Sequence, residues 1–327
     1  MQKVIFVHKQ APGDLLMLSA AIRDLHKGHP NKFLTDLRTN QPDIFLNNPY
    51  LTKIKDGEAD IIIEVKSALI NQSSGCAKHF IHSFKENIEK QLGISYPITA
   101  FKGDIHLSKA EMSWKSQIAE MGIKKPFWIL VSGGKFDFTS KYWPQEYYQE
   151  VINHFKNKIL FVHCGKKEHF HPKLDNCIDL IGKTSPRQFI RLMYHAIGAV
   201  CPITYTMHLA AATPSKYNLP SRPCIVIAGG LESPTWEAYP NHNFLHSVGT
   251  MKCCSTGGCW KSKCSLPKNK SFTSANICKN RVNWGEVPSD YKNELSDFYY
   301  PKCMTNITPK KVISAIEDYH NGDLLCF

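Results

Sequence analysis

The chain has 327 residues and 43% of them are hydrophobic, which excludes a wholly disordered protein and leaves room for two domains. Its 40 lysines and arginines against 28 aspartates and glutamates give a net charge of +12, which suits acidic partners: nucleotide diphosphates, phosphorylated glycans, nucleic acid or an anionic membrane. The apolar run at residues 4–7 is too short for a membrane span or a secretory signal, so we expect a cytoplasmic protein without an integral membrane segment.

The first part of the chain alternates short apolar runs with segments of helical periodicity. The patterns predict strands at residues 3–8, 32–38, 60–65 and 101–107, and helices that start at 14, 77 and 108. This alternation indicates an α/β fold with a doubly wound parallel sheet. Residues 122–126 read as a linker, so the predicted domains are 1–124 and 125–327.

Asp14 and two histidines are the candidate functional residues of the first domain. Asp14 starts a helix soon after a strand and a loop. It could be the N-cap of that helix or a general base at the mouth of the sheet, and the sequence leaves both interpretations open. His79 and His82 share one face of the next helix, which fits two surface or half-buried side chains better than a metal site.

A glycine-rich turn follows the first strand of the second domain. That strand starts at residue 127 and is followed by Ser132-Gly133-Gly134, where glycines let a phosphate approach the backbone closely. Lys141 precedes the helix that Pro144 starts, and we expect it to point back toward this turn. There it could neutralise a diphosphate, although a solvated lysine is an equally good interpretation.

The stretch at residues 180–212 is predicted to run through a helix, a short strand and a tight turn into a second helix. Thr184 or Ser185 can cap the first helix. The start of the second helix presents free amides to an anion, so a nucleotide diphosphate is expected there. The candidate donor-binding residues of this stretch are Gly182, Thr184, Thr206, Met207 and His208.

A third strand end carries glycines as well. Gly229-Gly230 follows the strongly apolar strand predicted at residues 223–228. The carboxyl ends of parallel strands share one edge of a sheet, so these turns place a ligand in the crevice at that edge.

Six cysteines fall between residues 253 and 303, within a cysteine-rich segment at 250–305. In a large chain of a reducing compartment such a cluster indicates a metal site rather than disulfides. A structural zinc or iron site is predicted at Cys254, Cys259, Cys278 and Cys303, with Cys253 and Cys264 as alternates and free thiols as the other interpretation. A final helix is predicted at residues 308–320.

Four motifs occur in a defined order within residues 1 to about 248. They are Gly13-Asp14-Leu15-Leu16 with Asn48-Pro49-Tyr50-Leu51, then Lys141-Tyr142-Trp143-Pro144, Gly182-Lys183-Thr184-Ser185 and Met207-His208-Leu209-Ala210-Ala211-Ala212. In this order they resemble glycosyltransferase family 9, the heptosyltransferases that use ADP-heptose. The resemblance implies the GT-B arrangement, in which two Rossmann-like domains face each other across a cleft.

The family resemblance also implies a function and a set of roles. The reaction would be an inverting transfer of a sugar from an ADP-sugar to an acceptor hydroxyl, without a catalytic metal. Asp14 would be the base, Lys141 would bind the diphosphate and stabilise the departing ADP, and amides near residues 206–208 would bind the same phosphates. One position departs from the family: Ile203 stands where an acidic residue is usual.

The acceptor and the assembly stay open at the level of sequence. The cysteine-rich segment is similar, in composition and placement, to the iron-binding insertion of bacterial autotransporter heptosyltransferases, which modify protein hydroxyls and form large rings. The acceptor could therefore be a lipopolysaccharide core, another glycan or a protein, and the chain could form a homo-oligomer. Two alternative functions are a catalytically inactive nucleotide-sugar-binding protein and a nucleic-acid-binding protein.

Overall fold

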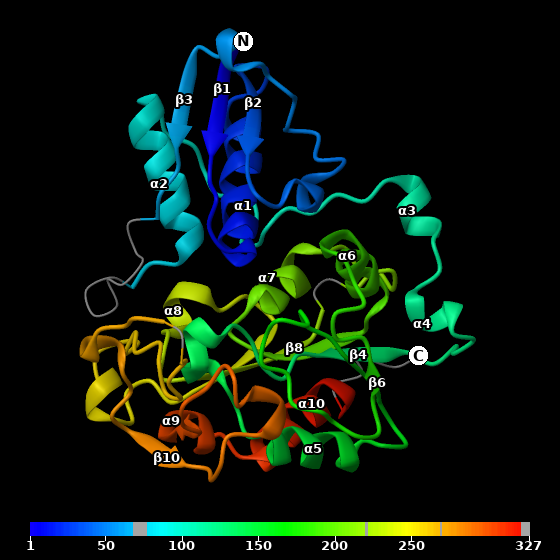
Figure 1. Cartoon of the computed structure of the whole chain (residues 1–327). Helices are drawn as coiled ribbons and strands as arrows, with labels where there is room; N and C mark the ends of the chain where they lie inside the picture. The colour runs from blue at the N-terminus through cyan, green and yellow to red at the C-terminus, as the bar shows by residue number, and fades with distance from the viewer. Residues whose placement is uncertain (68–76, 220–221, 269, 322–327) are drawn as a thin grey trace.

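The computed structural model describes residues 1–67, 77–219, 222–268 and 270–321. Two α/β units stand one above the other, each built on a parallel sheet (Figure 1). The α/β class with parallel sheets is therefore confirmed. Within the described ranges, no helix is both long and apolar enough to span a membrane.

The first unit contains a three-stranded sheet with the order β2-β1-β3. Its regular elements are β1 (Gln2–Val7), α1 (Pro12–Gly28), β2 (Phe33–Arg38), β3 (Ile61–Glu64), α2 (Phe80–Leu92), α3 (Lys109–Ser113) and α4 (Gln117–Glu120), with the short 3₁₀ helices η1 (Pro42–Phe45) and η2 (Asp56–Glu58). The central strand β1 pairs in parallel with both neighbours. Its apolar residues and those of α1 are buried together, as the sequence pattern predicts.

The strand predicted at residues 101–107 does not form, because side chains of α1 bind the main chain of this segment. Arg23 donates from Nη2 to the carbonyl oxygen of Ala100 at 2.5 Å and from Nη1 to that of Lys102 at 2.8 Å. The amide of Asp104 donates to Oγ of Ser19 at 2.8 Å. These bonds satisfy groups that a sheet ladder would otherwise pair.

The helix predicted to start at residue 108 is two short helices instead. Ser108 and Glu111 form the capping box of α3, so the predicted start is confirmed. Trp114 then has extended backbone angles, and Ser116 caps α4 by accepting the amide of Ala119. A second cap three residues after the first helix ends is what divides the segment.

The second unit contains a six-stranded parallel sheet with the order β6-β5-β4-β7-β8-β9. The strands are β4 (Phe127–Leu130), β5 (Leu160–His163), β6 (Ile178–Asp179), β7 (Gly198–Pro202), β8 (Cys224–Gly229) and β9 (His242–His246). Numbered from β4, this is the order 3-2-1-4-5-6 of dinucleotide-binding sheets. The order reverses between β4 and β7, and such a reversal is where these sheets bind ligands.

Helices flank this sheet, and the cysteine-rich segment packs against the end of strand β8. The helices of the second unit are α5 (Gln145–His154), α6 (Pro186–His195), α7 (Tyr205–Ala212), α8 (Pro234–Glu237), α9 (Lys302–Thr305) and α10 (Pro309–Asn321), with the 3₁₀ helices η3 (Phe136–Lys141), η4 (Lys252–Cys254), η5 (Ser274–Asn276) and η6 (Ser289–Tyr291). Ser185 forms a capping box with Gln188 at the start of α6, as predicted. The segment also carries the antiparallel pair β10 (Arg281–Asn283) and β11 (Tyr299–Pro301).

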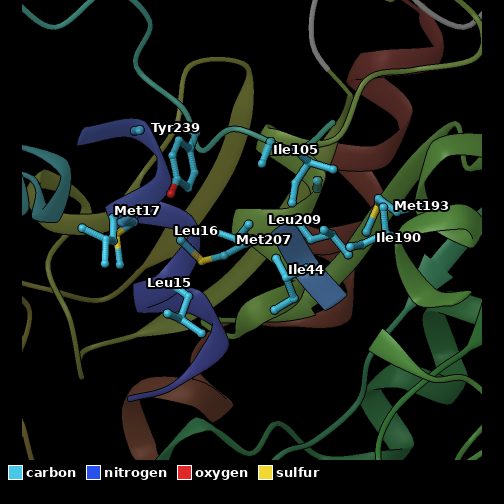
Figure 2. Packing of buried hydrophobic residues seen from close by; sticks show 14 of the residues in the cluster. Leu15, Leu16, Met17, Ile44, Ile105, Ile190, Met193, Met207, Leu209 and Tyr239 are labelled. Atoms are coloured by element: carbon cyan, nitrogen blue, oxygen red, sulfur yellow. The ribbon is translucent and has the colours of Figure 1, made fainter. Parts of the chain in front are cut away.

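The two units share one hydrophobic core where α1 meets α7. Figure 1 shows the N-terminal end of α1 directed at α7. Leu16 of α1 lies beside Met207 of α7 within that buried cluster (Figure 2). Gly103 permits a close approach, because a Cβ there would lie 2.8 Å from the carbonyl oxygen of Leu16. The start of α1 is therefore held against the second unit.

Candidate active site

Asp14 lies in the first turn of α1 and faces the second unit. The N-cap of α1 is Ala11, so the interpretation of Asp14 as the N-cap is wrong. Burial raises the pKa of Asp14, and the charge of Glu232 adds to this effect, while His8 and Lys141 oppose it. A carboxylate with a raised pKa is a better proton acceptor, which suits a general base.

Lys141 is the last residue of η3 and forms a buried ion pair. Its Nζ lies 3.0 Å from Oε1 of Glu232 and 5.1 Å from the ring centroid of Phe138. Burial acts to lower the pKa of Lys141, but the nearby carboxyl groups, that of Glu232 first among them, outweigh it and raise that pKa. Lys141 is therefore charged, and the fold brings it within electrostatic range of Asp14 from the other unit.

Two glutamates complete this group and were missed by the sequence analysis. Glu232 follows β8, and Glu237 ends α8; they are 3% and 7% exposed. Burial and the charge of Glu232 raise the pKa of Glu237 well above its usual range, so Glu237 keeps its proton. The position of Glu232, two residues after Gly229-Gly230 at a strand end, was the available sequence signal.

His208 joins the same group from α7. Its Nδ1 lies 2.7 Å from the hydroxyl of Tyr239, and its Nε2 lies 3.7 Å from Oε2 of Glu237. Burial lowers the pKa of His208 well below its usual range, and the charges of His79 and Lys141 add to this effect. The ring is therefore neutral and its contact with protonated Glu237 is not an ion pair. We call Asp14, Lys141, Glu232, Glu237 and His208 the charged cluster, after the Lys141–Glu232 ion pair that it contains.

The start of α7 is placed beside the charged cluster. The helix begins at Tyr205, one residue before the predicted start, and Thr204 is its N-cap without a side-chain capping bond. Thr206 and Met207 are buried in the first turn. The proposed role of their main-chain amides as phosphate ligands stays a prediction. Ile203 is 2% exposed and belongs to the hydrophobic core, so this turn carries no carboxylate at that position.

The glycine turn after β4 packs against a neighbouring segment. Gly134 and Phe170 exchange two main-chain hydrogen bonds of 3.0 Å, so the Gly134 amide is already paired. A Cβ on Gly133 would lie 1.8 Å from the carbonyl oxygen of Phe170. Oγ of Ser132 lies 2.6 Å from Nε2 of His163. These contacts explain the two glycines by close packing, and the turn's role in donor binding stays a prediction.

The other candidate donor residues lie at the ends of β6 and β8. Gly182 has a φ of 69°, and its amide donates to the carbonyl of Gly165 at 2.8 Å. The strand order puts Gly182 and Thr184 two strands away from β4. A Cβ on Gly229 would lie 2.5 Å from Sδ of Met304, and one on Gly230 would lie 3.1 Å from Sγ of Cys254. Both of these glycines therefore pack against the cysteine-rich part of the chain.

The cysteine-rich segment holds both ends of the Lys141–Glu232 pair. On the lysine side, the amide of Ser140 donates to the carbonyl of Ser262 at 3.1 Å, and Cys264 donates its amide to Oγ1 of Thr139 at 2.8 Å. On the glutamate side, the amide of Cys259 donates to the carbonyl of Gly230 at 2.9 Å. The segment thus holds the main chain next to Lys141 and Glu232 in place.

The four predicted metal ligands lie close together in this segment. Cys303 is within electrostatic range of Cys254, Cys259 and Cys278. A hydrogen bond from Cys264 lowers the pKa of Cys278 to about 7, and burial raises that of Cys259 to about 12. Across the ranges that the structure describes, no three histidine, cysteine or acidic side chains are arranged to hold a metal ion. The donor set is present, but its arrangement is not that of a closed tetrahedral site.

His79 is a buried N-cap and not a surface side chain. Its Nδ1 accepts the amide of Ile81 at 3.2 Å, and its ring centroid lies 4.5 Å from that of Phe101 and 5.3 Å from that of Tyr239. Burial lowers its pKa to about 4. His82 is half-buried, as expected, with its ring centroid 5.9 Å from that of Phe101.

The chain is similar to known proteins in its sequence and in its fold. The model of glycosyltransferase family 9 (heptosyltransferase) matches residues 65–217, whereas no curated protein sequence matches the chain. The structure of E. coli ADP-heptose LPS heptosyltransferase II has a TM-score of 0.59 and 14% identity, and the match covers 99% of each chain. That of a family 9 glycosyl transferase from Veillonella parvula DSM 2008 has a TM-score of 0.57 and 13% identity, over 79% of this chain and 92% of that one.

A third similar structure is the iron-containing dodecameric glycosyltransferase TibC of enterotoxigenic E. coli H10407. Its TM-score is 0.61 at 18% identity, over 98% of this chain and 76% of that one. At these identities the structures establish a shared GT-B fold, while the family model matches the sequence itself. Residues 65–217 thus match glycosyltransferase family 9, the heptosyltransferase family, and the chain shares the fold of these glycosyltransferase structures.

Proposed function

We propose that this glycosyltransferase transfers heptose from ADP-heptose to an acceptor hydroxyl with inversion at the anomeric carbon. One observation carries the proposal: Asp14 from the first unit and Lys141 from the second lie within electrostatic range of each other. A base and a cation on opposite units suit a reaction in which the base takes a proton from the acceptor and the cation binds the phosphate of the departing nucleotide. Similar structures include TibC in complex with ADP-D-β-D-heptose and E. coli heptosyltransferase WaaC with ADP.

The proposed reaction is a single displacement. The acceptor oxygen attacks the anomeric carbon as Asp14 takes its proton, and the bond from that carbon to the phosphate oxygen breaks. ADP leaves with the bonding electron pair, so negative charge develops on its terminal phosphate. Lys141 stabilises that charge, with help from main-chain amides at the start of α7. One attack from the opposite face gives inversion, and no covalent enzyme intermediate forms.

Donor binding must rearrange the charged cluster. In the present structure Lys141 pairs with Glu232 at 3.0 Å, and a diphosphate would compete with that carboxylate for the same ammonium group. Asp14 belongs to the first unit and Lys141 to the second, so a diphosphate that replaces Glu232 beside Lys141 would also lie near Asp14.

We also propose that Cys254, Cys259, Cys278 and Cys303 bind a structural zinc or iron ion. Four thiolates are a suitable soft donor set, and Cys303 already lies near the other three. Such an ion would fasten the cysteine-rich segment, and four protein ligands would leave no position for substrate. The ion would act through the segment's hydrogen bonds to Thr139, Ser140 and Gly230.

The acceptor and the assembly are proposed by analogy with the similar structures. TibC is described as dodecameric, and heptosyltransferase II is described as acting on LPS. A hydroxyl of a lipopolysaccharide core, another glycan or a protein is therefore the proposed acceptor, and a homo-oligomer is the proposed assembly. Size-exclusion chromatography with light scattering measures the assembly directly.

A donor panel tests the proposed function. The protein is incubated with ADP-heptose and with other ADP-, UDP- and GDP-sugars, and binding is measured by thermal shift before sugar release is measured by chromatography. We expect ADP-heptose to bind and to be consumed, and D14N to bind it without turnover. Binding without turnover in the wild type would instead identify a nucleotide-sugar-binding protein, and failure of every nucleotide to bind would contradict the proposal.

A further inference from the structure

The two units are joined by a second contact besides that of α1 with α7. Arg187 lies in the first turn of α6 in the second unit, and Glu111 lies in α3 of the first. Nε of Arg187 donates to Oε1 of Glu111 at 2.6 Å, and Nη2 donates to Oε2 at 2.7 Å. The two side chains are 11% and 8% exposed, so this two-point ion pair is largely shielded from solvent.

Arg187 also lies against main-chain groups of the first unit. Its Nη2 donates to the carbonyl oxygen of His106 at 2.8 Å, and its Nη1 lies 3.5 Å from the carbonyl oxygen of Ile44 in η1. Ile44 and Ile190 of α6 belong to the hydrophobic core that both units share (Figure 2). One side chain of the second unit is thus attached to the first unit at three positions.

The carboxylate of Glu111 is itself held in place by other groups. Its Oε2 accepts the amide of Ser108 at 2.8 Å, which is part of the α3 capping box, and Nδ2 of Asn47 at 2.7 Å. Burial acts to raise the pKa of Glu111, but the hydrogen bonds from Arg187 and Ser108 outweigh it and lower that pKa. Glu111 is therefore ionised at neutral pH, and it offers Arg187 a partner whose position is fixed.

Arg187 is also close to the start of α7, on the side of the active site. The ring centroid of Phe189, in α6, lies 6.2 Å from that of Tyr205, the first residue of α7. Burial raises the pKa of Tyr205, and the charge of Arg187 opposes that rise, so the guanidinium group is within electrostatic range of this residue. The helix that packs against α1 is thus also the neighbour of the Arg187–Glu111 pair.

A single contact between two rigid bodies lets them rotate about it, whereas a second contact at another place fixes the angle between them. The contact of α1 with α7 is the first, and the Arg187–Glu111 pair is the second. We propose that Arg187 is a positioning residue, whose link to Glu111 fixes the angle between the units and keeps Asp14 aligned with Lys141. The inference rests on the proposed function, because that function assigns the roles of Asp14 and Lys141.

The experiment compares Arg187→Met with the control Arg191→Met, one turn later on the same helix. Arg191 donates to the carbonyl oxygen of Lys115 at 2.7 Å and to Oε1 of Glu120 at 2.5 Å, both in the segment that leads into the second unit. We expect Arg187→Met to lower kcat for sugar transfer about tenfold or more, because small misplacements of reacting groups are costly. Binding of ADP, measured by calorimetry, should change less than about twofold, since its proposed ligands belong to the second unit. Arg191→Met should change neither.

The pKa of Asp14 gives a second readout, which does not require activity. It is measured by NMR on protein labelled at the aspartate carboxyl carbons, with the signal assigned through Asp14→Asn. Burial raises this pKa in the wild type. A changed angle between the units would expose Asp14 to water, so Arg187→Met should move its pKa down toward the ordinary value of aspartate. A loss of stability that leaves the angle unchanged would not move it.

Arg187→Lys guards against misfolding of the methionine variant. Lysine keeps a positive charge for Glu111 but lacks the planar group that binds both carboxylate oxygens and the carbonyl of His106. It should unfold at nearly the wild-type temperature and still lower kcat, with ADP binding unchanged.

Two results would overturn the inference and leave the proposed function intact. One is a wild-type kcat and Asp14 pKa in both Arg187 variants, and the other is a loss of ADP affinity as large as the loss of kcat. If the wild type transfers no sugar, the proposed function fails. The Asp14 pKa then still decides whether Arg187 fixes the angle between the units.

Discussion

Gly13 and His208 belong to different α/β units and lie in direct contact. A Cβ on Gly13 would lie 2.8 Å from Cδ2 of His208, closer than carbon atoms pack. Asp14 is the next residue, so this contact sets how near the proposed base comes to the second unit. The absence of a side chain at position 13 thus allows α1 and α7 to approach this closely.

Gly13→Ala should lower kcat/KM for sugar transfer at least tenfold. The added methyl group must push α1 away from α7, and overpacking of this kind costs about 1–3 kcal/mol of unfolding free energy. Steady-state kinetics and chemical denaturation measure the two effects. Gly57→Ala is the control, because no atom lies within 4 Å of a Cβ built at Gly57. Equal behaviour of the two variants would show that the Gly13–His208 contact is unimportant.

Asp14→Asn should abolish transfer without destabilising the protein. The pKa of Asp14 is raised in the folded state, so the folded state binds its proton more tightly than the unfolded chain does. That contribution to stability is present below the ordinary pKa of aspartate and is lost as the pH rises through the raised value. The amide side chain of the Asp14→Asn variant cannot ionise, so the variant does not lose this stability. Its thermal unfolding at neutral pH should therefore occur at the same temperature as that of the wild type or higher.

The pH profile gives a separate test of Asp14. In the wild type, kcat/KM should fall in acid with an inflection above the ordinary aspartate pKa, because the protonated carboxyl group cannot act as the base. Transfer rates from pH 4 to pH 8 measure the profile. An inflection at or below the ordinary value would contradict the proposed role.

Lys141→Met should lower kcat about a hundredfold or more, since it removes a cation that stabilises developing charge. It should also cost roughly 3 kcal/mol of stability, because Glu232 would be left buried without its partner. The double variant Lys141→Met with Glu232→Gln should recover stability but not activity. Lys270→Met is the control, because its ion pair with Asp137 is exposed and contributes at most about 1 kcal/mol. Recovered activity in the double variant would exclude a role for the lysine charge.

Elemental analysis should find about one zinc or iron per chain. Cys303→Ser should reduce that metal content and also lower transfer activity, because the cysteine-rich segment holds the residues next to Lys141 and Glu232. Cys177→Ser is the control, since Cys177 lies outside this segment and bonds to the carbonyl of Leu174. A metal-free protein that is folded and fully active would contradict the proposed ion.

The sequence predicted elements well where the signals are local. The capping box of α6 at Ser185, the strand β7 and the final helix α10 follow from cap residues and apolar periodicity within a few positions. The segment at residues 101–107 has a strand-like pattern, but Arg23 donates hydrogen bonds to the carbonyl groups of Ala100 and Lys102. A side chain about eighty residues away decided that outcome, and no local signal reports it.

The sequence by itself therefore determined the α/β class, the parallel sheets and the family motifs, because periodicity and turn chemistry act over short distances. Only the tertiary structure decided which charged side chains lie close together. The strand order brings the ends of β4, β7 and β8 to one edge, and the contact of α1 with α7 adds Asp14 from the other unit. Glu232 and Lys141, about ninety residues apart, became partners in a buried environment where neither could stay charged alone.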